Sequence, residues 1–77
     1  MKYKVGDVVQ VKAAGTNKPA ADGENLWEIV GVDGFDCAIR NMYDEYRANQ
    51  DNKHTSAQQF DTSLVLPWKG KLPIQFC

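Results

Sequence analysis

Residues whose side chains could do chemistry are few and scattered in this 77-residue chain. His54 is the only histidine, and no cysteine lies near it in the sequence, so the ligand spacing of a zinc site is missing. Among the serines, Ser63 has the context of a turn residue rather than of a nucleophile. The acidic residues do not follow the spacing of a calcium loop, and no glycine-rich phosphate loop is present. The sequence therefore predicts no catalytic residue, no metal ligand and no cofactor.

Aromatic side chains with polar or basic neighbours are more informative. Small barrels bind peptides or bases through exposed aromatic residues that line a groove. Tyr43 and Tyr46 lie in a polar stretch, and Trp68 stands next to Lys69, where it either stacks on a partner or pins the tail. Trp27 is expected in the core, because tryptophan is mostly buried. The predicted binding residues are Tyr43, Tyr46, Arg47, Trp68 and Lys69.

Length, charge and cysteine content limit the class of protein. A chain of 77 residues forms one domain with a small core. A formal net charge of −1 argues against a generic polyanion binder. Cys37 and Cys77 are too few for a disulfide framework, and Cys37 has the context of a buried thiol. Because no signal peptide or membrane-spanning run is visible, we expect a cytoplasmic protein with no membrane association.

The stretch from Leu26 to Arg40 has the strongest structural signal. Asp33-Gly34 separates two runs rich in Trp, Ile, Val and Phe, which is typical of a β-hairpin. We expect the second strand to bury Phe35, Cys37 and Ile39. The first strand carries apolar residues on both faces, so its second face needs cover by a loop or a partner chain. One face holds Trp27 and Ile29, and the other holds Leu26, Val30 and Val32.

The segments before this hairpin favour one strand and one long loop. Alternation from Lys4 to Lys12 predicts a strand, with a bend or bulge at Gly6-Asp7 just after its start that leads into Val8 to Lys12. Its inward residues are expected to be Val5, Val9 and Val11. Residues 13–25 are rich in glycine, proline, asparagine and aspartate, and they predict a long loop.

The segments after the hairpin are more polar. A short helix over Tyr43 to Asn49 and an extended hairpin loop fit this part of the sequence equally well. Phe60 is expected to end a short strand, and the oxygens of residues 61–63 favour a single 3₁₀ turn. Leu64 to Leu66 predict a last strand, which Pro67 stops. In the tail, Leu72, Ile74 and Phe76 alternate as in an edge strand.

The order of these segments resembles the bacterial SH3-like small barrels, a superfamily that includes KOW-like and Tudor-like domains. The residues that carry the likeness are Val5-Gly6-Asp7-Val8-Val9, Trp27-Glu28-Ile29-Val30, Phe35 to Arg40 and Phe60 to Pro67. The resemblance implies an all-β, SH3-like antiparallel barrel of about five strands over residues 1–67. A long polar insertion interrupts it, and residues 68–77 form a C-terminal tail or edge strand.

This likeness concerns the fold rather than an activity. A distantly similar enzyme family, the type II dihydrofolate reductases, has a Val-Gln-Ile-Tyr run where this chain has Leu64-Val65-Leu66-Pro67, so no catalytic residue carries over. We expect a non-enzymatic binding or assembly module, such as an accessory protein of a mobile genetic element. Its expected partners are a protein or peptide and, through the tail, a second copy of the chain.

Two alternatives stay open. The first is a nucleic-acid-binding barrel, and the second is a small oligomeric enzyme resembling the type II dihydrofolate reductases. The basic residues that would serve the first alternative are Lys2, Lys4, Lys12, Arg40, Arg47, Lys69 and Lys71.

Overall fold

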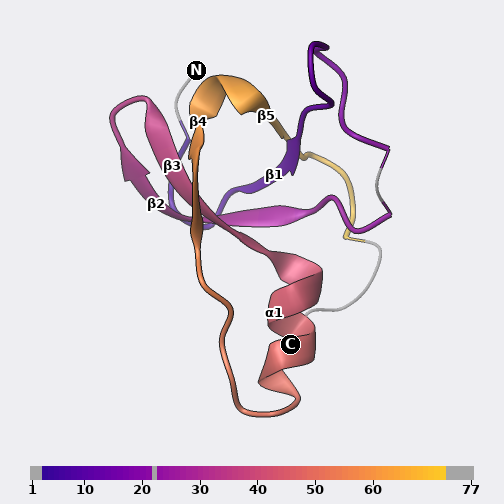
Figure 1. Cartoon of the computed structure of the whole chain (residues 1–77), viewed down its shortest axis with the longest axis vertical. Coiled ribbons are helices and arrows are strands. Elements are labelled where there is room, and N and C mark those ends of the chain that lie inside the picture. Colours follow the sequence, from indigo (N-terminus) through magenta and orange to yellow (C-terminus); the bar gives the residue numbers. More distant parts are fainter. Residues whose placement is uncertain (1–2, 22, 73–77) are drawn as a thin grey trace.

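A single antiparallel sheet of five strands organises the computed structural model, which describes residues 3–21 and 23–72 (Figure 1). The strand order is β4-β3-β2-β1-β5, so β4 and β5 occupy the two edges and the sheet is not closed. The prediction of a mostly β chain with five antiparallel strands is confirmed. The elements are β1 (Val8–Val11), β2 (Trp27–Asp33), β3 (Asp36–Asn41), α1 (Met42–Asn49), β4 (Gln58–Asp61), the 3₁₀ turn η1 (Thr62–Leu64) and β5 (Val65–Pro67).

The turn of the β2–β3 hairpin lies one position later than the sequence suggested. Asp33 pairs with Asp36, so Gly34 and Phe35 are the central residues of the turn. Of these two, only Gly34 has a positive φ, at 61°, which is the pattern of a type II′ turn with glycine first. Phe35 therefore lies at the hairpin tip and is 85% exposed. The prediction that Phe35 is buried is wrong.

The faces of β2 also differ from a simple alternation. The register against β3 shifts between Ile29 and Gly31. Ile29 lies opposite Ile39, but Val32 lies opposite Cys37, so the irregularity moves Val32 to the face of Ile29. The predicted grouping of Val32 with the opposite face is wrong for this reason.

The hydrophobic core lies mainly on one face of the sheet. Cys37 and Ile39 are buried there as predicted, and the Cys37 thiol is free. Leu26 is buried within a single chain, so it does not require a partner chain for cover. The buried cluster is Val9, Ile29, Cys37, Ile39 and Val65, with Tyr3, Val11, Trp27 and Phe60 packed against it.

The N-terminal strand is shorter than predicted. Val5 and Gly6 form a turn, in which Gly6 has a φ of 100°, and β1 begins only at Val8. Val9 is buried and Val11 packs on the core, as expected, but Val5 is 63% exposed. The prediction that Val5 points inward is therefore wrong, because the turn precedes the strand instead of interrupting it.

The polar segment after β3 begins with the helix α1 rather than an extended loop. Asn41 ends β3, and its Oδ1 accepts the Asp44 N–H at 2.9 Å as the helix N-cap. The Nδ2 of Asn41 donates to the Glu24 carbonyl at 2.9 Å. One buried asparagine thus joins a strand, a helix and the loop before β2.

The predicted 3₁₀ turn and the last strand are both present. The Asp61 carboxylate accepts the Ser63 N–H at 2.8 Å and caps η1. Residues 68–72 belong to no strand. The predicted edge strand at the end of the tail lies largely outside the described residues, as does Cys77.

Candidate binding groove

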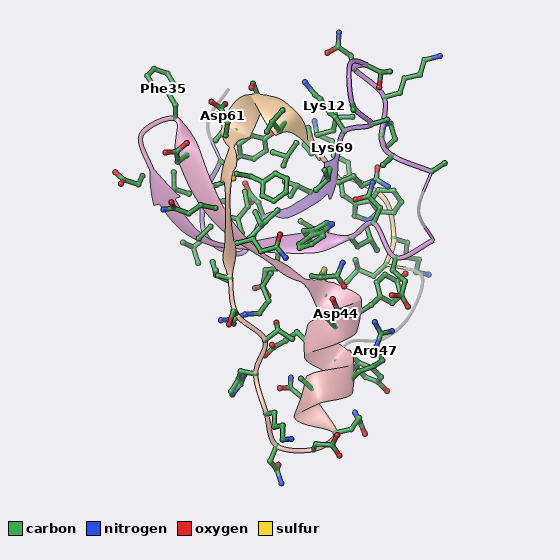
Figure 2. All side chains as sticks on the ribbon, in the orientation of Figure 1. Lys12, Phe35, Asp44, Arg47, Asp61 and Lys69 are labelled. Carbon is green, nitrogen blue, oxygen red and sulfur yellow. The ribbon has the colours of Figure 1, made fainter. Side chains whose placement is uncertain are left out.

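The five predicted binding residues do not come together in the structure. Tyr43, Tyr46 and Arg47 belong to α1, whereas Trp68 and Lys69 follow β5. Figure 2 shows Arg47 on the helix and Lys69 near β1, well away from it. None of the three hollows described below is lined by residues from both groups, so each group is considered separately.

Arg47 fastens α1 to the loop that precedes β2. Its Nη1 and Nη2 donate to the two carboxylate oxygens of Glu24 at 2.7 and 2.9 Å, and Nη2 also contacts Asp44. These hydrogen bonds lower the pKa of Glu24. A bidentate pair of this kind holds both partners in place. Arg47 is therefore a structural cation rather than a free binding residue.

Glu45 fastens the other side of α1 to the chain that returns toward β4. Its carboxylate accepts the Thr55 N–H at 2.8 Å and the Thr55 hydroxyl at 3.0 Å, and it pairs with Nδ1 of His54 at 2.6 Å. The bond from the Thr55 backbone, followed by that from His54, lowers the pKa of Glu45 to about 2. His54 is accordingly an exposed partner of a helix carboxylate. No group of histidine, cysteine and acidic residues in the described part of the chain could hold a metal ion.

Trp68 pins the tail to the sheet. Its backbone N–H donates to the Val8 carbonyl at 2.9 Å. Gly70 packs so closely on the indole ring that a Cβ added at Gly70 would lie 3.0 Å from it. The indole Nε1 is buried, and none of the described residues forms a hydrogen bond with it. Of the two roles considered for Trp68, the structure favours the pin over an exposed stacking surface.

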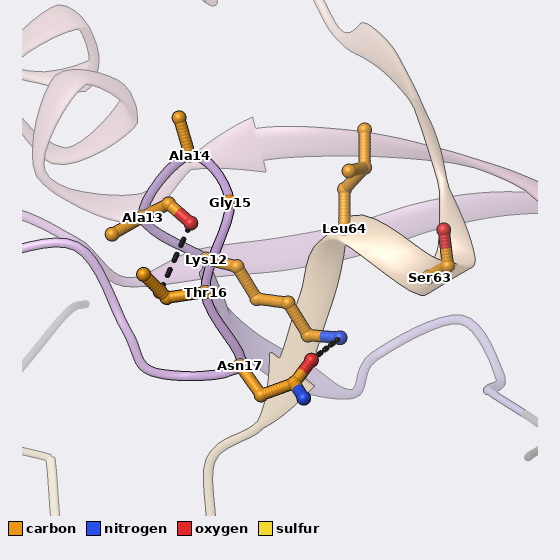
Figure 3. Close-up of a pocket in the computed structure, with 8 residues that line it drawn as sticks. All are labelled: Lys12, Ala13, Ala14, Gly15, Thr16, Asn17, Ser63 and Leu64. Carbon is orange, nitrogen blue, oxygen red and sulfur yellow. Dashed lines mark hydrogen bonds between the residues drawn. The ribbon is translucent and has the colours of Figure 1, made fainter.

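Three hollows adjoin one another along η1 and β5. The first, of about 360 Å³, lies between residues 12–17 and the 3₁₀ turn (Figure 3). The second, of about 320 Å³, lies between the hairpin tip, η1 and β5. The third, of about 210 Å³, lies where the tail leaves β5 beside β1.

Shared lining residues show that these hollows adjoin one another, and together we call them the η1 groove. Lys12 and Ser63 line both the first and the second hollow. Tyr3 and Pro67 line both the second and the third. The side chains that define the groove below are Tyr3, Lys12, Phe35, Leu64, Pro67 and Lys69.

Backbone contacts hold the apolar side chains of the groove in place. The Thr62 N–H donates to the Phe35 carbonyl at 2.8 Å, which ties the hairpin tip to η1. The Tyr3 hydroxyl donates to the Val65 carbonyl at 3.4 Å, and burial raises the pKa of Tyr3. Phe35 and Leu64 stay exposed, at 85% and 48%. Exposed apolar surface is thus presented on a hydrogen-bonded framework.

The loop that closes one end of the groove is folded on itself. The Ala13 N–H donates to the Lys18 carbonyl at 2.9 Å. The Thr16 hydroxyl lies 3.1 Å from the Ala13 carbonyl and 3.3 Å from that of Lys18. The predicted long loop is therefore present, with a defined turn in which Gly15 has a φ of 74°.

The edge of β5 in the groove offers few backbone groups for strand addition. Pro67 has no N–H, and the Val65 carbonyl accepts the Tyr3 hydroxyl. The Val65 N–H donates to the Thr62 carbonyl. Proline and occupied backbone groups are common protections of an edge strand. A ligand in this groove would therefore contact side chains rather than extend the sheet.

Sequence reasoning missed most of this site. Tyr3 was not singled out, and Phe35 was assigned to the core. A turn read as Gly34-Phe35, with glycine in the first central position, would have placed Phe35 at the exposed tip. No local pattern connects Lys12 to Leu64, which only the pairing of β1 with β5 brings close, or Tyr3 to the Val65 carbonyl that its hydroxyl bonds.

Comparisons with known proteins identify no relative of the chain. No protein-family model matches the chain, and neither a curated protein nor a solved structure matches it. Within residues 3–21 and 23–72, no helix has the length and apolar character needed to cross a membrane.

Proposed function

We propose that the chain is a non-enzymatic binding module that holds an extended segment of a protein partner in the η1 groove. The observation that carries this proposal is that three adjoining hollows follow one another across β1, η1 and β5. Extended peptides are commonly recognised in grooves of this kind, where aromatic and apolar side chains line the contact surface. The SH3-like assignment is a further reason to expect such a role, and it stays a prediction.

The distribution of exposed apolar residues supports the same role. Single exposed apolar side chains are normal, but clusters mark interaction sites. Phe35 and Leu64 are both exposed: Phe35 lines the second hollow with Tyr3 and Pro67, and Leu64 lines the adjoining first hollow. A partner that covers them would remove apolar surface from water without any rearrangement of the sheet.

Nucleic acid remains the weaker alternative. Arg40 lies 3.7 Å from a Glu45 oxygen, and Arg47 pairs with Glu24 and Asp44, so both arginines of the basic set face carboxylates. With a formal net charge of −1, we expect no binding tighter than micromolar to duplex DNA at physiological salt.

Self-association through the tail also stays a prediction. Ile74 and Phe76, on which it depends, lie outside the described residues. Light scattering under reducing conditions tests it, because a monomer at high micromolar concentration would contradict it.

Selection from a library of short displayed peptides tests the proposed function. The chain is immobilised, and the enriched peptides are measured against Phe35→Ser and against Val5→Ser. Val5 is a matched control, because it is 63% exposed and lines none of the three hollows. We expect peptides that bind the unaltered chain and Val5→Ser equally and lose at least about tenfold in affinity on Phe35→Ser, a loss of about 1.4 kcal/mol. The proposal would be contradicted if no peptide is enriched, or if the enriched peptides bind Phe35→Ser with unchanged affinity.

A further inference from the structure

Lys12 differs from the other lysines of the described chain. It is partly buried, whereas the remaining described lysines are exposed. Its Nζ forms one hydrogen bond, with Asn17 Oδ1, at the long distance of 3.5 Å. No carboxylate of the described residues lies within ion-pair distance of it. The exposed lysines are Lys4, Lys18, Lys53, Lys69 and Lys71.

The position of Lys12 places this cation inside the groove. Lys12 lines the first two hollows, and Figure 3 shows its side chain extending between the loop and η1 toward Asn17. The second hollow also contains Asp61, but that carboxylate caps η1 through the Ser63 N–H at 2.8 Å. The groove thus combines an ammonium that has no carboxylate partner among the described residues with the apolar surface of Phe35 and Leu64.

A cation in a groove binds best to a partner that supplies the opposite charge at the same place. We propose that the η1 groove selects peptide segments in which an aspartate or glutamate stands beside a large apolar residue. The peptide carboxylate pairs with Lys12 Nζ, and the apolar side chain packs against Phe35 and Leu64. This inference rests on the proposed function and specifies the chemistry of the partner.

Two polar residues, Asn17 and Ser63, line the same hollow as Lys12. Asn17 Oδ1 accepts the hydrogen bond from Lys12 Nζ, and the Ser63 hydroxyl bonds the Asp61 carboxylate. The hollow thus holds one ammonium, which suits a single carboxylate.

A polyanion suits the groove less well. Binding of nucleic acid draws its affinity from several cations that neutralise successive phosphates. The groove instead includes the carboxylates of Asp7 and Asp61 in its lining. These would repel a phosphate backbone that runs along the groove, but a single peptide carboxylate at Lys12 can avoid them.

The test compares two displayed libraries of random peptides. The first library includes aspartate and glutamate among its residues, and the second replaces them by asparagine and glutamine. The best acidic peptide and its amide counterpart are then titrated against the unaltered chain, Lys12→Met and Lys12→Arg. Lys53→Met is the control, because Lys53 is exposed and lines none of the hollows. Circular dichroism confirms that each variant is folded.

We expect acidic peptides to be enriched and to lose about tenfold in affinity on Lys12→Met, with most of the affinity kept on Lys12→Arg and all of it on Lys53→Met. The amide counterpart should bind equally weakly to the unaltered chain and to Lys12→Met, which is the signature of a direct pair. Higher salt should reduce the difference between the acidic and the amide peptide.

Four results would overturn this inference. One is the selection of peptides that need Phe35 but contain no acidic residue, and another is acidic peptides whose affinity does not change on Lys12→Met. Both results would leave the proposed function standing. A single-stranded oligonucleotide that binds more tightly than the acidic peptide, and loses affinity on Lys12→Met, would also overturn the inference. Failure to select any Phe35-dependent peptide overturns the proposed function, and this inference with it.

Discussion

The side chain of Asn25 pairs with the backbone of Val11 as a neighbouring strand would. Oδ1 of Asn25 accepts the Val11 N–H at 2.9 Å, and Nδ2 donates to the Val11 carbonyl at 2.9 Å. The register of β1 against β2 covers only Val8 and Val9, so this amide satisfies β1 beyond the point where β2 diverges. Asn25 is buried, and it also bonds the Ala20 carbonyl and the Trp27 indole.

Replacement of Asn25 by alanine should destabilise the fold strongly. The change leaves the Val11 N–H and the Trp27 indole N–H without their partner, while the Val11 carbonyl keeps the Ala20 N–H at 3.0 Å. Unsatisfied buried polar groups cost about 1–3 kcal/mol each. We expect a loss of roughly 2–4 kcal/mol in the free energy of unfolding, measured with urea. Asn17→Ala, in the exposed loop, is the control and should change stability by less than about 0.5 kcal/mol. Equal effects of the two changes would contradict this role of Asn25.

The corrected positions of Ile39 and Phe35 give a second prediction. Ile39 is fully buried in β3, so Ile39→Ala should cost about 2–5 kcal/mol through lost burial and the cavity left behind. Phe35 is 85% exposed at the hairpin tip, so Phe35→Ala should change the free energy of unfolding by less than about 0.5 kcal/mol. Thermal and urea unfolding of both variants measure this contrast. A large loss on Phe35→Ala would place its ring in the core after all.

Stability should fall in acid because of Glu45. Its pKa is lowered from 4.5 in the unfolded chain to about 2 in the folded one, chiefly by the hydrogen bond from the Thr55 N–H. The stabilisation by this carboxylate is therefore complete above pH 4.5 and is lost as the pH falls toward about 2. Glu45→Gln should be less stable than the unaltered chain at neutral pH and should show a smaller acid dependence. If the free energy of unfolding of the two proteins falls equally with decreasing pH, this account of Glu45 is contradicted.

Much of the fold could be predicted because its signals are local. The glycine turn between apolar runs indicated the β2–β3 hairpin, and the oxygens of Asp61, Thr62 and Ser63 indicated η1. Phe35 was misplaced because a shift of one residue in a turn decides whether a side chain is buried. Val32 was misplaced because a register irregularity in β2 leaves no clear mark in the sequence.

The site was harder to predict than the fold. The groove is lined by Tyr3, Lys12, Phe35 and Leu64, which are far apart in the sequence and are brought together by strand pairing and by long-range hydrogen bonds. The role of Arg47 depends on Glu24, an ion pair across 23 positions of the chain. The sequence fitted a helix and a loop equally well after β3. In the structure Asn41 caps α1 and is itself held by the Glu24 carbonyl, a contact distant in the sequence.

An amide NMR titration with a selected peptide tests the central claim most directly, because it locates the contact without any mutation. If the η1 groove is the binding site, the largest shift changes will occur at Tyr3, Lys12, Phe35 and Leu64, and α1 will change little. Saturable changes centred on Tyr43, Tyr46 and Arg47, with the groove unaffected, would contradict the account.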